Sequence, residues 1–296
     1  MALPSTPEGW AIQLSKLLAL TMGDTPFPVN VRELAIEYSR NAFPAEAITL
    51  IQGADLSNAI EGMLHPKGNG EWGIFYNTNI SSSGRQNFTL AHEFGHYLLH
   101  RHLQPQGFEC GNRELHDRGL QNIESEANRF ASVLLMPPKD FREQIAGTTP
   151  NLELMRHLAK RYEVSITAAM LQWLEFTDQR AMVVAGIDGF IDWARSSPAL
   201  FKSGLYYRAR QEITELPLNC LANQKVSLLE LVLEKKHPSG VWLGREPVEE
   251  FVLFQKGNRT ISLLIYPKHG ISYFTDDEEP LEDIYDRISK NIGGRR

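Results

Sequence analysis

The residues best able to perform chemistry lie in one pentapeptide, His92-Glu93-Phe94-Gly95-His96. On a helix, His92 and His96 lie one turn apart on the same face, with about 5–6 Å between their Cβ atoms. Two imidazoles at that spacing can bind one zinc ion, while Glu93 on the adjacent face can reach a water on the metal. The metal lowers the pKa of that water, and the glutamate takes its proton and passes it to the leaving amine. The spacing therefore predicts metal-assisted hydrolysis.

A second helix is predicted to supply the third metal ligand. Glu124 and Asn128 are four residues apart and share one helix face. We predict Glu124 as the ligand and Asn128 as an amide that orients a ligand histidine through its distal ring nitrogen. Glu126 is the alternative ligand, and it points about 200° away from Glu124. Helix geometry therefore favours Glu124.

Capping residues and apolar spacing delimit the two helices that must hold these side chains. The first is predicted over about residues 84–101, with three preceding serines available as caps. The second is predicted over about residues 120–136, and the proline pair at 137–138 ends it. Close contact between them is expected at Gly95, opposite two alanines of the second helix. The ligand face of the first helix can then line a cleft.

Other side chains near this pair are weaker candidates. His100 continues the helical spacing, but one helix face rarely presents three residues to a single ion. Cys110 could mask or sense the metal, and we interpret it as a plain free thiol. Four further residues are candidates for contacting the substrate or stabilising an oxyanion: His116, Asp117, Tyr97 and His102.

Elements outside the two helices are predicted from turn residues and alternation. A hairpin is expected over about residues 60–76, and a strand of it could accept an extended substrate peptide by edge addition. A helical pair over residues 151–175 looks like the first half of a helix-turn-helix motif. Its second helix, over residues 166–174, has no Lys or Arg to reach phosphates or bases. We therefore interpret the pair as structural.

The sequence changes character near residues 177–180, where we place a domain boundary. Turn signals at Asp188-Gly189 and Gly257-Asn258 predict hairpins in the second region. We expect an α+β protein with a peptidase domain over residues 1–177, ending in the helical pair, and a mixed α/β domain over residues 178–296. The acidic run over residues 276–286 is interpreted as a solvated face. The second domain is expected to be regulatory or partner-binding.

Composition limits the class of protein. The chain has 296 residues, and its 42% hydrophobic and 22% charged residues are typical of a globular protein of about two domains. A net charge of −6 and the lack of a long basic cluster argue against direct nucleic-acid binding. The two cysteines cannot build a disulfide framework, and no apolar run suits a leader or a membrane span. We therefore expect a cytoplasmic protein without membrane or nucleic-acid partners.

The two helical motifs together resemble the signatures of the ImmA/IrrE metallopeptidases. The resemblance is carried by RQNFTLAHEFGHYLLH at residues 85–100 and ESEANRFASVLLMP at residues 124–137, and it covers about residues 29–176. It implies a gluzincin-like, zincin-type zinc peptidase domain in which a small twisted sheet packs on the active-site helix. It also implies one zinc per chain, with water in the fourth position. The implied ligands are His92, His96 and Glu124, and the implied catalytic residue is Glu93.

The resemblance also implies a biological role. In this family the cleaved partner is typically a DNA-binding transcriptional repressor, so proteolysis would switch gene expression in a stress response. The alternative is a non-catalytic, zinc-containing regulator or adaptor that binds its partner without cleaving it. Glu93 favours the enzyme, because a purely structural site has no use for a general base and would close with a fourth protein ligand.

Overall fold

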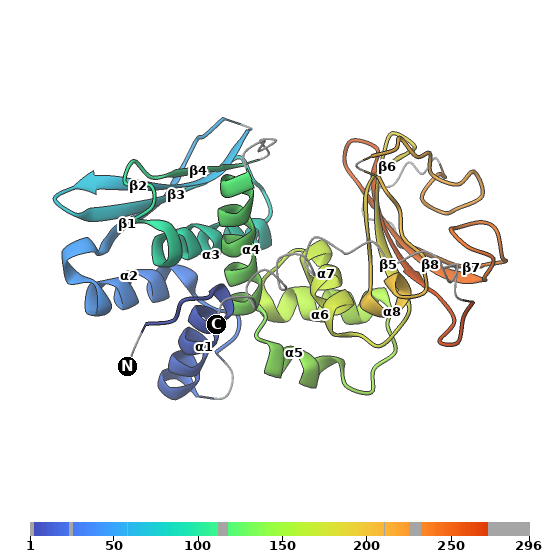
Figure 1. Cartoon of the computed structure of the whole chain (residues 1–296), viewed down its shortest axis with the longest axis horizontal. Helices are drawn as coiled ribbons and strands as arrows, with labels where there is room; N and C mark the ends of the chain where they lie inside the picture. The colour runs from blue at the N-terminus through green and yellow to red at the C-terminus, as the bar shows by residue number, and fades with distance from the viewer. Residues whose placement is uncertain are drawn as a thin grey trace. The chain divides into compact units, whose positions relative to one another are not determined.

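The computed structural model describes residues 3–23, 26–57, 59–111, 118–209, 211–224 and 232–271 (Figure 1). The chain divides into two compact units, Met1–Gln172 and Trp173–Arg296. The candidate residues His116 and Asp117, and the acidic run at 276–286, lie outside the described residues. None of the described helices is long and apolar enough to cross a bilayer.

Unit 1 begins with two capped helices. The Thr6 side chain accepts a hydrogen bond from the Gly9 backbone at the start of α1 (Pro7–Met22), and Asn30 caps α2 (Val31–Ala42) in the same way. The buried face of α1 consists of Trp10, Ala11, Leu14 and Leu18, whereas Leu17 is exposed. A short 3-10 turn, η1 (Pro44–Glu46), then leads into the sheet.

A four-stranded sheet forms the upper layer of unit 1. Its strands are β1 (Ile48–Ala54), β2 (Ile60–Gly68), β3 (Glu71–Asn77) and β4 (Phe108–Gly111), in the order β1-β3-β2-β4. β1 is parallel to β3, and the other pairs are antiparallel. The β2–β3 turn is short, because Asn69 and Gly70 take the positive φ angles of 53° and 82° that close a tight hairpin.

β3 is paired with β1, and residues 60–64 of β2 are paired with β4. The prediction that a hairpin strand could accept a substrate peptide by edge addition is therefore wrong for that part of β2 in the structure as it stands. The reason is β4, four residues in the long connection between the two motif helices, which occupies the outer edge of β2.

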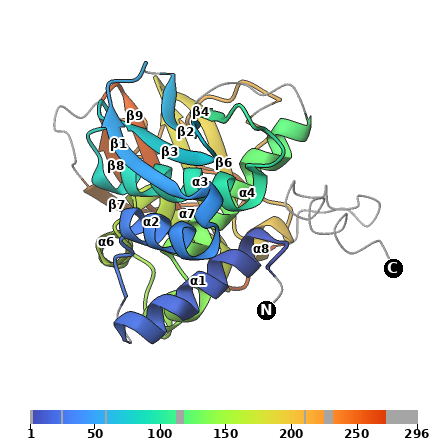
Figure 2. The same cartoon turned by 90° about the vertical axis from the view of Figure 1, so that its left-hand side faces the viewer.

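The motif helices lie on one face of this sheet (Figures 1 and 2). α3 (Ser83–His100) is capped by Ser82 and packs against β2 and β3, and α4 (Arg118–Leu135) crosses it. At the crossing, a Cβ added to Gly95 would lie 2.9 Å from the Phe130 ring and 3.3 Å from the Ala127 Cα atom. The close approach predicted at Gly95 is confirmed, and it brings the two sets of candidate ligands together.

Three helices follow α4. The proline pair ends α4, and Pro138 also begins α5 (Pro138–Ile145), which the sequence analysis did not predict. Proline suits the first turn of a helix as well as a helix stop, because its missing N–H is not needed there. The helical pair was predicted, and it forms α6 (Leu152–Tyr162) and α7 (Ile166–Phe176), separated at Glu163 with φ 49°.

The described part of unit 2 is built on a five-stranded antiparallel sheet. Its strands are β5 (Ala181–Ile187), β6 (Phe190–Ser196), β7 (Val232–His237), β8 (Val248–Gln255) and β9 (Arg259–Ile265), in the order β6-β5-β9-β8-β7. Both predicted hairpins are present, with positive φ at their turns. Besides the end of α7, the helical content described here is α8 (Pro198–Phe201), so this region contains less helix than the expected mixed α/β domain.

A buried carboxylate organises the interior of unit 2. Glu250 on β8 is fully buried. Two backbone N–H groups and three side chains surround it at hydrogen-bond distance: Leu221 N (2.8 Å), Ala222 N (3.1 Å), His237 Nε2 (2.8 Å), Trp242 Nε1 (3.1 Å) and Ser262 Oγ (2.9 Å). The carboxylate therefore ties three strands to two loops.

Glu250→Ala is expected to lower the free energy of unfolding of unit 2 by at least about 3 kcal/mol, because it leaves a buried set of donors without an acceptor. Urea unfolding followed by tryptophan fluorescence measures this. Glu249→Ala is the matched control on the same strand, since Glu249 pairs at 3.6 Å with the exposed Lys236, and we expect a change below about 1 kcal/mol. Equal effects from the two variants would contradict the role given to Glu250.

Candidate metal centre

Four side chains of unit 1 place potential metal-binding atoms within 4.8 Å of one another. We call this set the donor cluster: His92, His96, Cys110 and Glu124. The two histidine Nε2 atoms are 3.0 Å apart, and oxygens of Glu124 lie 3.1 Å from His92 Nε2 and 3.4 Å from His96 Nε2. Donor atoms around a tetrahedral ion with bonds of 2.0–2.3 Å are separated by about 3.3–3.6 Å. The donor cluster therefore has the dimensions of a metal site.

Asn128 holds His92 in the orientation that this site requires. Its Oδ1 atom lies 3.0 Å from His92 Nδ1, on the ring edge away from the donor cluster. A carbonyl oxygen can only accept, so Nδ1 carries the proton and Nε2 presents its lone pair to the cluster. The predicted position of Asn128 beside a ligand histidine agrees with this geometry.

His96 is oriented by a chain of two further side chains. Its Nδ1 atom lies 3.1 Å from His100 Nδ1, and His100 Nε2 lies 2.9 Å from Glu126 Oε2. One assignment of protons satisfies both contacts: His96 Nδ1–H donates to His100 Nδ1, and His100 Nε2–H donates to the Glu126 carboxylate. His100 and Glu126, both weighed as metal ligands, therefore face each other outside the donor cluster. Sequence spacing placed them near the site but did not show this relay.

The protonation states of His96 and Glu124 suit a cation. Burial lowers the pKa of His96 to about 4, so its ring is neutral at pH 7. Burial alone would raise the pKa of Glu124, but hydrogen bonds with His92 and His96 outweigh it and hold that pKa well below its usual range. Burial opposes protonation of His92, yet contact with Glu124 and the charge of Glu93 raise its pKa overall. An ionised carboxylate beside a neutral imidazole is what a divalent ion binds.

Glu93 lies beside the donor cluster without joining it. Its side chain is fully buried, and neither carboxylate oxygen has a hydrogen-bond partner in the part of the chain that the structure describes. Burial raises its pKa to about 7. A buried carboxylate without a partner is costly, so its retention next to a metal-binding set indicates a function in proton transfer. The donor set and this orphaned carboxylate together fit a catalytic metal.

The remaining candidates lie apart from the cluster. The Tyr97 hydroxyl is buried and donates at 2.9 Å to the backbone oxygen of Glu46, so we do not propose it for an oxyanion. Burial raises its pKa to about 12. His102 is largely exposed, with Nδ1 3.6 Å from Glu46 Oε1.

Cys110 is the cluster member whose place the sequence analysis missed. It lies on β4, and its Sγ atom is 3.8 Å from Glu124 Oε1. The sequence alone does not show that Cys110 lies near the other donors, because only the pairing of β4 with β2 brings its thiol over α3. Alternation over residues 108–111 was the available signal, but four residues are too few to separate a strand from a loop.

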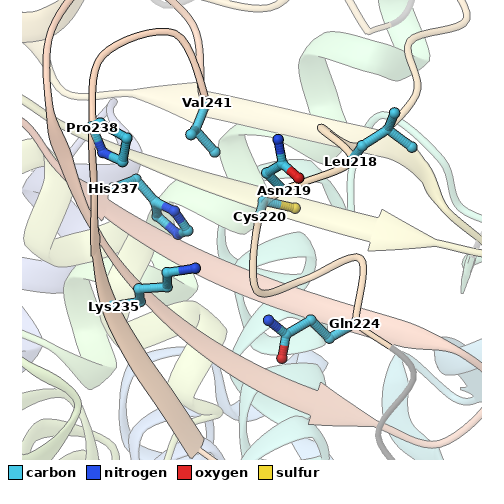
Figure 3. A pocket seen from close by; sticks show the side chains of 8 residues that line it. All are labelled: Leu218, Asn219, Cys220, Gln224, Lys235, His237, Pro238 and Val241. Atoms are coloured by element: carbon cyan, nitrogen blue, oxygen red, sulfur yellow. The ribbon is translucent and has the colours of Figure 1, made fainter.

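Unit 2 contains a cavity of about 390 Å³ (Figure 3). Its lining includes Cys220, Lys235 and His237, so a cysteine nucleophile was conceivable. Burial raises the pKa of Cys220 to about 12, which leaves the thiol protonated and unreactive at neutral pH. His237 is already held by Glu250 at 2.8 Å. The cavity therefore offers no activated nucleophile.

Asn128→Ala is expected to weaken metal binding by about 10–100-fold without removing the site, because the variant frees the His92 ring but keeps every ligand atom. Competition with a chromophoric chelator measures the affinity. Asn41→Ala is the control, since this amide on α2 is exposed and bonds only to its own helix among the described contacts. If Asn128→Ala matches the wild-type affinity, His92 is not oriented through Asn128.

Two histidines one turn apart, a carboxylate from the next helix and an orphaned glutamate under a small sheet define a zincin-like metallopeptidase domain. Residues 48–172 match the family model described as the IrrE N-terminal-like domain. Residues 48–172 of this chain are therefore similar to the metallopeptidase domain of the ImmA/IrrE family.

Named relatives agree with this assignment. The chain is 36% identical over 98 residues to the radiation response metalloprotease IrrE of Deinococcus radiodurans, covering 31% of this chain and 28% of that protein. It is 32% identical over 91 residues to the metallopeptidase ImmA of Bacillus subtilis, covering 31% and 50%. It is 30% identical over 159 residues to IrrE of Deinococcus deserti, covering 50% and 53%. The chain thus spans about half or less of the length of these relatives.

A solved structure resembles a larger share of the chain. A Mycobacterium tuberculosis transcriptional regulator matches with a TM-score of 0.56 over 86% of this chain and 76% of that chain, at 12% identity. At this identity the likeness concerns the fold alone.

Proposed function

We propose that this protein is a zinc-dependent endopeptidase that cleaves a regulatory protein, a DNA-binding transcriptional repressor, and so switches gene expression. The observation that carries the proposal is Glu93, a fully buried carboxylate beside the donor cluster that has no hydrogen-bond partner among the described residues. A metal that only stabilised the fold would have no use for a base at this position.

In this proposal, His92, His96 and Glu124 hold the zinc. When bound, the ion polarises the scissile carbonyl and makes water acidic enough to attack at neutral pH. Glu93 takes the proton from the attacking water and delivers it to the leaving amine, for which a pKa of about 7 is well suited. Asn128 and the His100–Glu126 pair keep both imidazole lone pairs directed at the ion.

Protein substrates are supported by the relatives, which are named as metalloproteases. A repressor as substrate rests on the family resemblance of the two motif helices. Direct DNA binding by this chain is not proposed, because α7 carries no Lys or Arg and the net charge is −6.

One observation favours the alternative of a non-catalytic adaptor. Cys110 gives the cluster a fourth potential protein ligand, and four protein ligands are typical of a closed, structural zinc site. Glu93 favours the enzyme instead, since its carboxylate would have no function in a closed site.

Cleavage in a co-expression experiment separates the two. The full chain is expressed with candidate repressors, beginning with one encoded beside its gene, and the products are analysed by mass spectrometry. We expect one defined fragment pair with the wild-type chain and none with Glu93→Gln. An intact repressor that co-purifies with the wild-type chain would establish the adaptor instead.

We further propose that the second domain, over about residues 178–296, governs which partner is cut or when. The donor cluster lies wholly in unit 1, and no comparable set of three or more ligand side chains occurs elsewhere among the described residues. A separate domain can raise the effective concentration of a substrate or hold the enzyme inactive until a ligand binds. A chain ending near Thr177 should bind zinc but lose partner selection or signal response; unchanged regulated cleavage would make the domain a stabilising appendage only.

A further inference from the structure

We propose that Cys110 is a fourth protein ligand of the metal, and that strand β4 thereby closes the catalytic site in a latent state. The proposal rests on the proposed function for its biological meaning, but the ligation itself can be tested without any substrate. The proposal explains why the site combines two features. Four protein donors are typical of a closed metal site, whereas Glu93 can act only when one position on the metal is open to water.

The position of β4 is fixed on the ligand helix. Phe108 and Cys110 are two residues apart on the strand and therefore project to the same side. The Phe108 ring stacks on the His96 imidazole, with centroids 4.4 Å apart and an interplanar angle of 20°. This stacking sets the register that directs the Cys110 side chain at the donor cluster.

The absence of a side chain on β2 permits this approach. Cys110 is paired with Gly62, and a Cβ at Gly62 would lie 2.5 Å from Thr89 Cγ2 and 2.7 Å from Glu93 Oε1. β2 is thus pressed against α3 at the position where β4 lies beside it. A larger residue at 62 would lift both strands from the cluster.

The surroundings of the thiol call for a cation. Cys110 is buried, and its Sγ atom is 3.8 Å from Glu124 Oε1. A divalent ion bound here would offset the charge of both neighbouring carboxylates and bind the sulfur as the thiolate, with the thiol proton leaving to solvent. The orphaned Glu93 carboxylate, aimed at the same place, is the second sign that a charged group belongs there.

Ligation by Cys110 has a consequence for activity. A thiolate in the fourth position excludes both the substrate carbonyl and the attacking water. Cleavage then requires β4 to leave, and β4 is a four-residue edge strand paired only with β2 among the described strands. A substrate segment that competes with β4 for the edge of β2 would displace β4 and open the metal in the same step.

Cobalt substitution tests the ligation directly. The full chain is loaded with Co²⁺ alone, and the near-ultraviolet region is scanned for thiolate-to-cobalt charge transfer. We expect the band in the wild type and in Cys220→Ser, the control for the other buried thiol. Cys110→Ser should lose the band while still binding one Co²⁺. The same band in Cys110→Ser, or none in a wild type that binds Co²⁺, would overturn the proposal.

X-ray absorption at the zinc edge of the wild type gives an answer even if the variant fails to fold. One sulfur neighbour at about 2.3 Å supports ligation, and none overturns it. Cleavage assays then separate the two hypotheses. A sulfur ligand without cleavage of any partner would leave the ligation standing and contradict the proposed function, whereas cleavage without a sulfur ligand would do the reverse. If both hold, Cys110→Ser should raise the basal cleavage rate.

Discussion

Glu93→Gln is expected to slow partner cleavage by about 10²–10⁴-fold while leaving fold and metal content intact. The amide is nearly isosteric with the carboxylate but cannot accept a proton from the attacking water. The substitution keeps the size of the side chain, and neither carboxylate oxygen makes a geometrically defined hydrogen bond among the described residues. Single-turnover cleavage at equal metal loading measures the effect.

Glu37→Gln on α2 is the control for this measurement, because its carboxylate is exposed and pairs only with Arg40 within the same helix among the described ion pairs. We expect an unchanged rate from it. A wild-type rate in Glu93→Gln would move proton transfer to another group.

His96→Ala and Glu124→Ala are expected to reduce bound metal from one ion per chain to near zero after dialysis. Each removes one of three donor atoms that lie 3.0–3.4 Å from one another, and losing any of these three is expected to lower the affinity enough for dialysis to remove the ion. Elemental analysis of the dialysed proteins measures the stoichiometry.

His157→Ala provides the comparison, because this exposed histidine contacts Gln144 on the protein surface. It should retain one ion per chain. Full metal retention by both His96→Ala and Glu124→Ala would show that the ion binds elsewhere.

Local signals in the sequence were sufficient to predict the two helices of unit 1 that carry the donor residues. The helical spacing of His92 and His96, the serine cap at position 82 and the small residue at Gly95 each act over a few residues, and the structure contains the helices they predict. The preference for Glu124 over Glu126 followed from the direction of side chains around one helix. In the structure Glu124 lies in the donor cluster and Glu126 faces His100, and the ligand role of Glu124 stays a prediction.

What the sequence analysis missed depends on contacts between distant segments. β4 is four residues long, and only its pairing with β2 identifies it as a strand. The same pairing moves Cys110 from a connecting segment into the donor cluster and removes the free edge expected for the hairpin. In unit 2, nothing local indicates that Glu250 is a buried acceptor, because its partners come from residues 12 to 29 positions away along the chain, apart from Trp242 at 8.

The central claim is that the crossing of α3 and α4 forms one catalytic metal site. Anomalous diffraction recorded on either side of the zinc absorption edge, from crystals of the zinc-loaded full chain, tests it most directly. The account predicts a single zinc peak bonded to Nε2 of His92, Nε2 of His96 and a carboxylate oxygen of Glu124, with Glu93 adjacent and unbound. A zinc peak elsewhere, or none between these side chains in protein shown to contain zinc, would contradict the account.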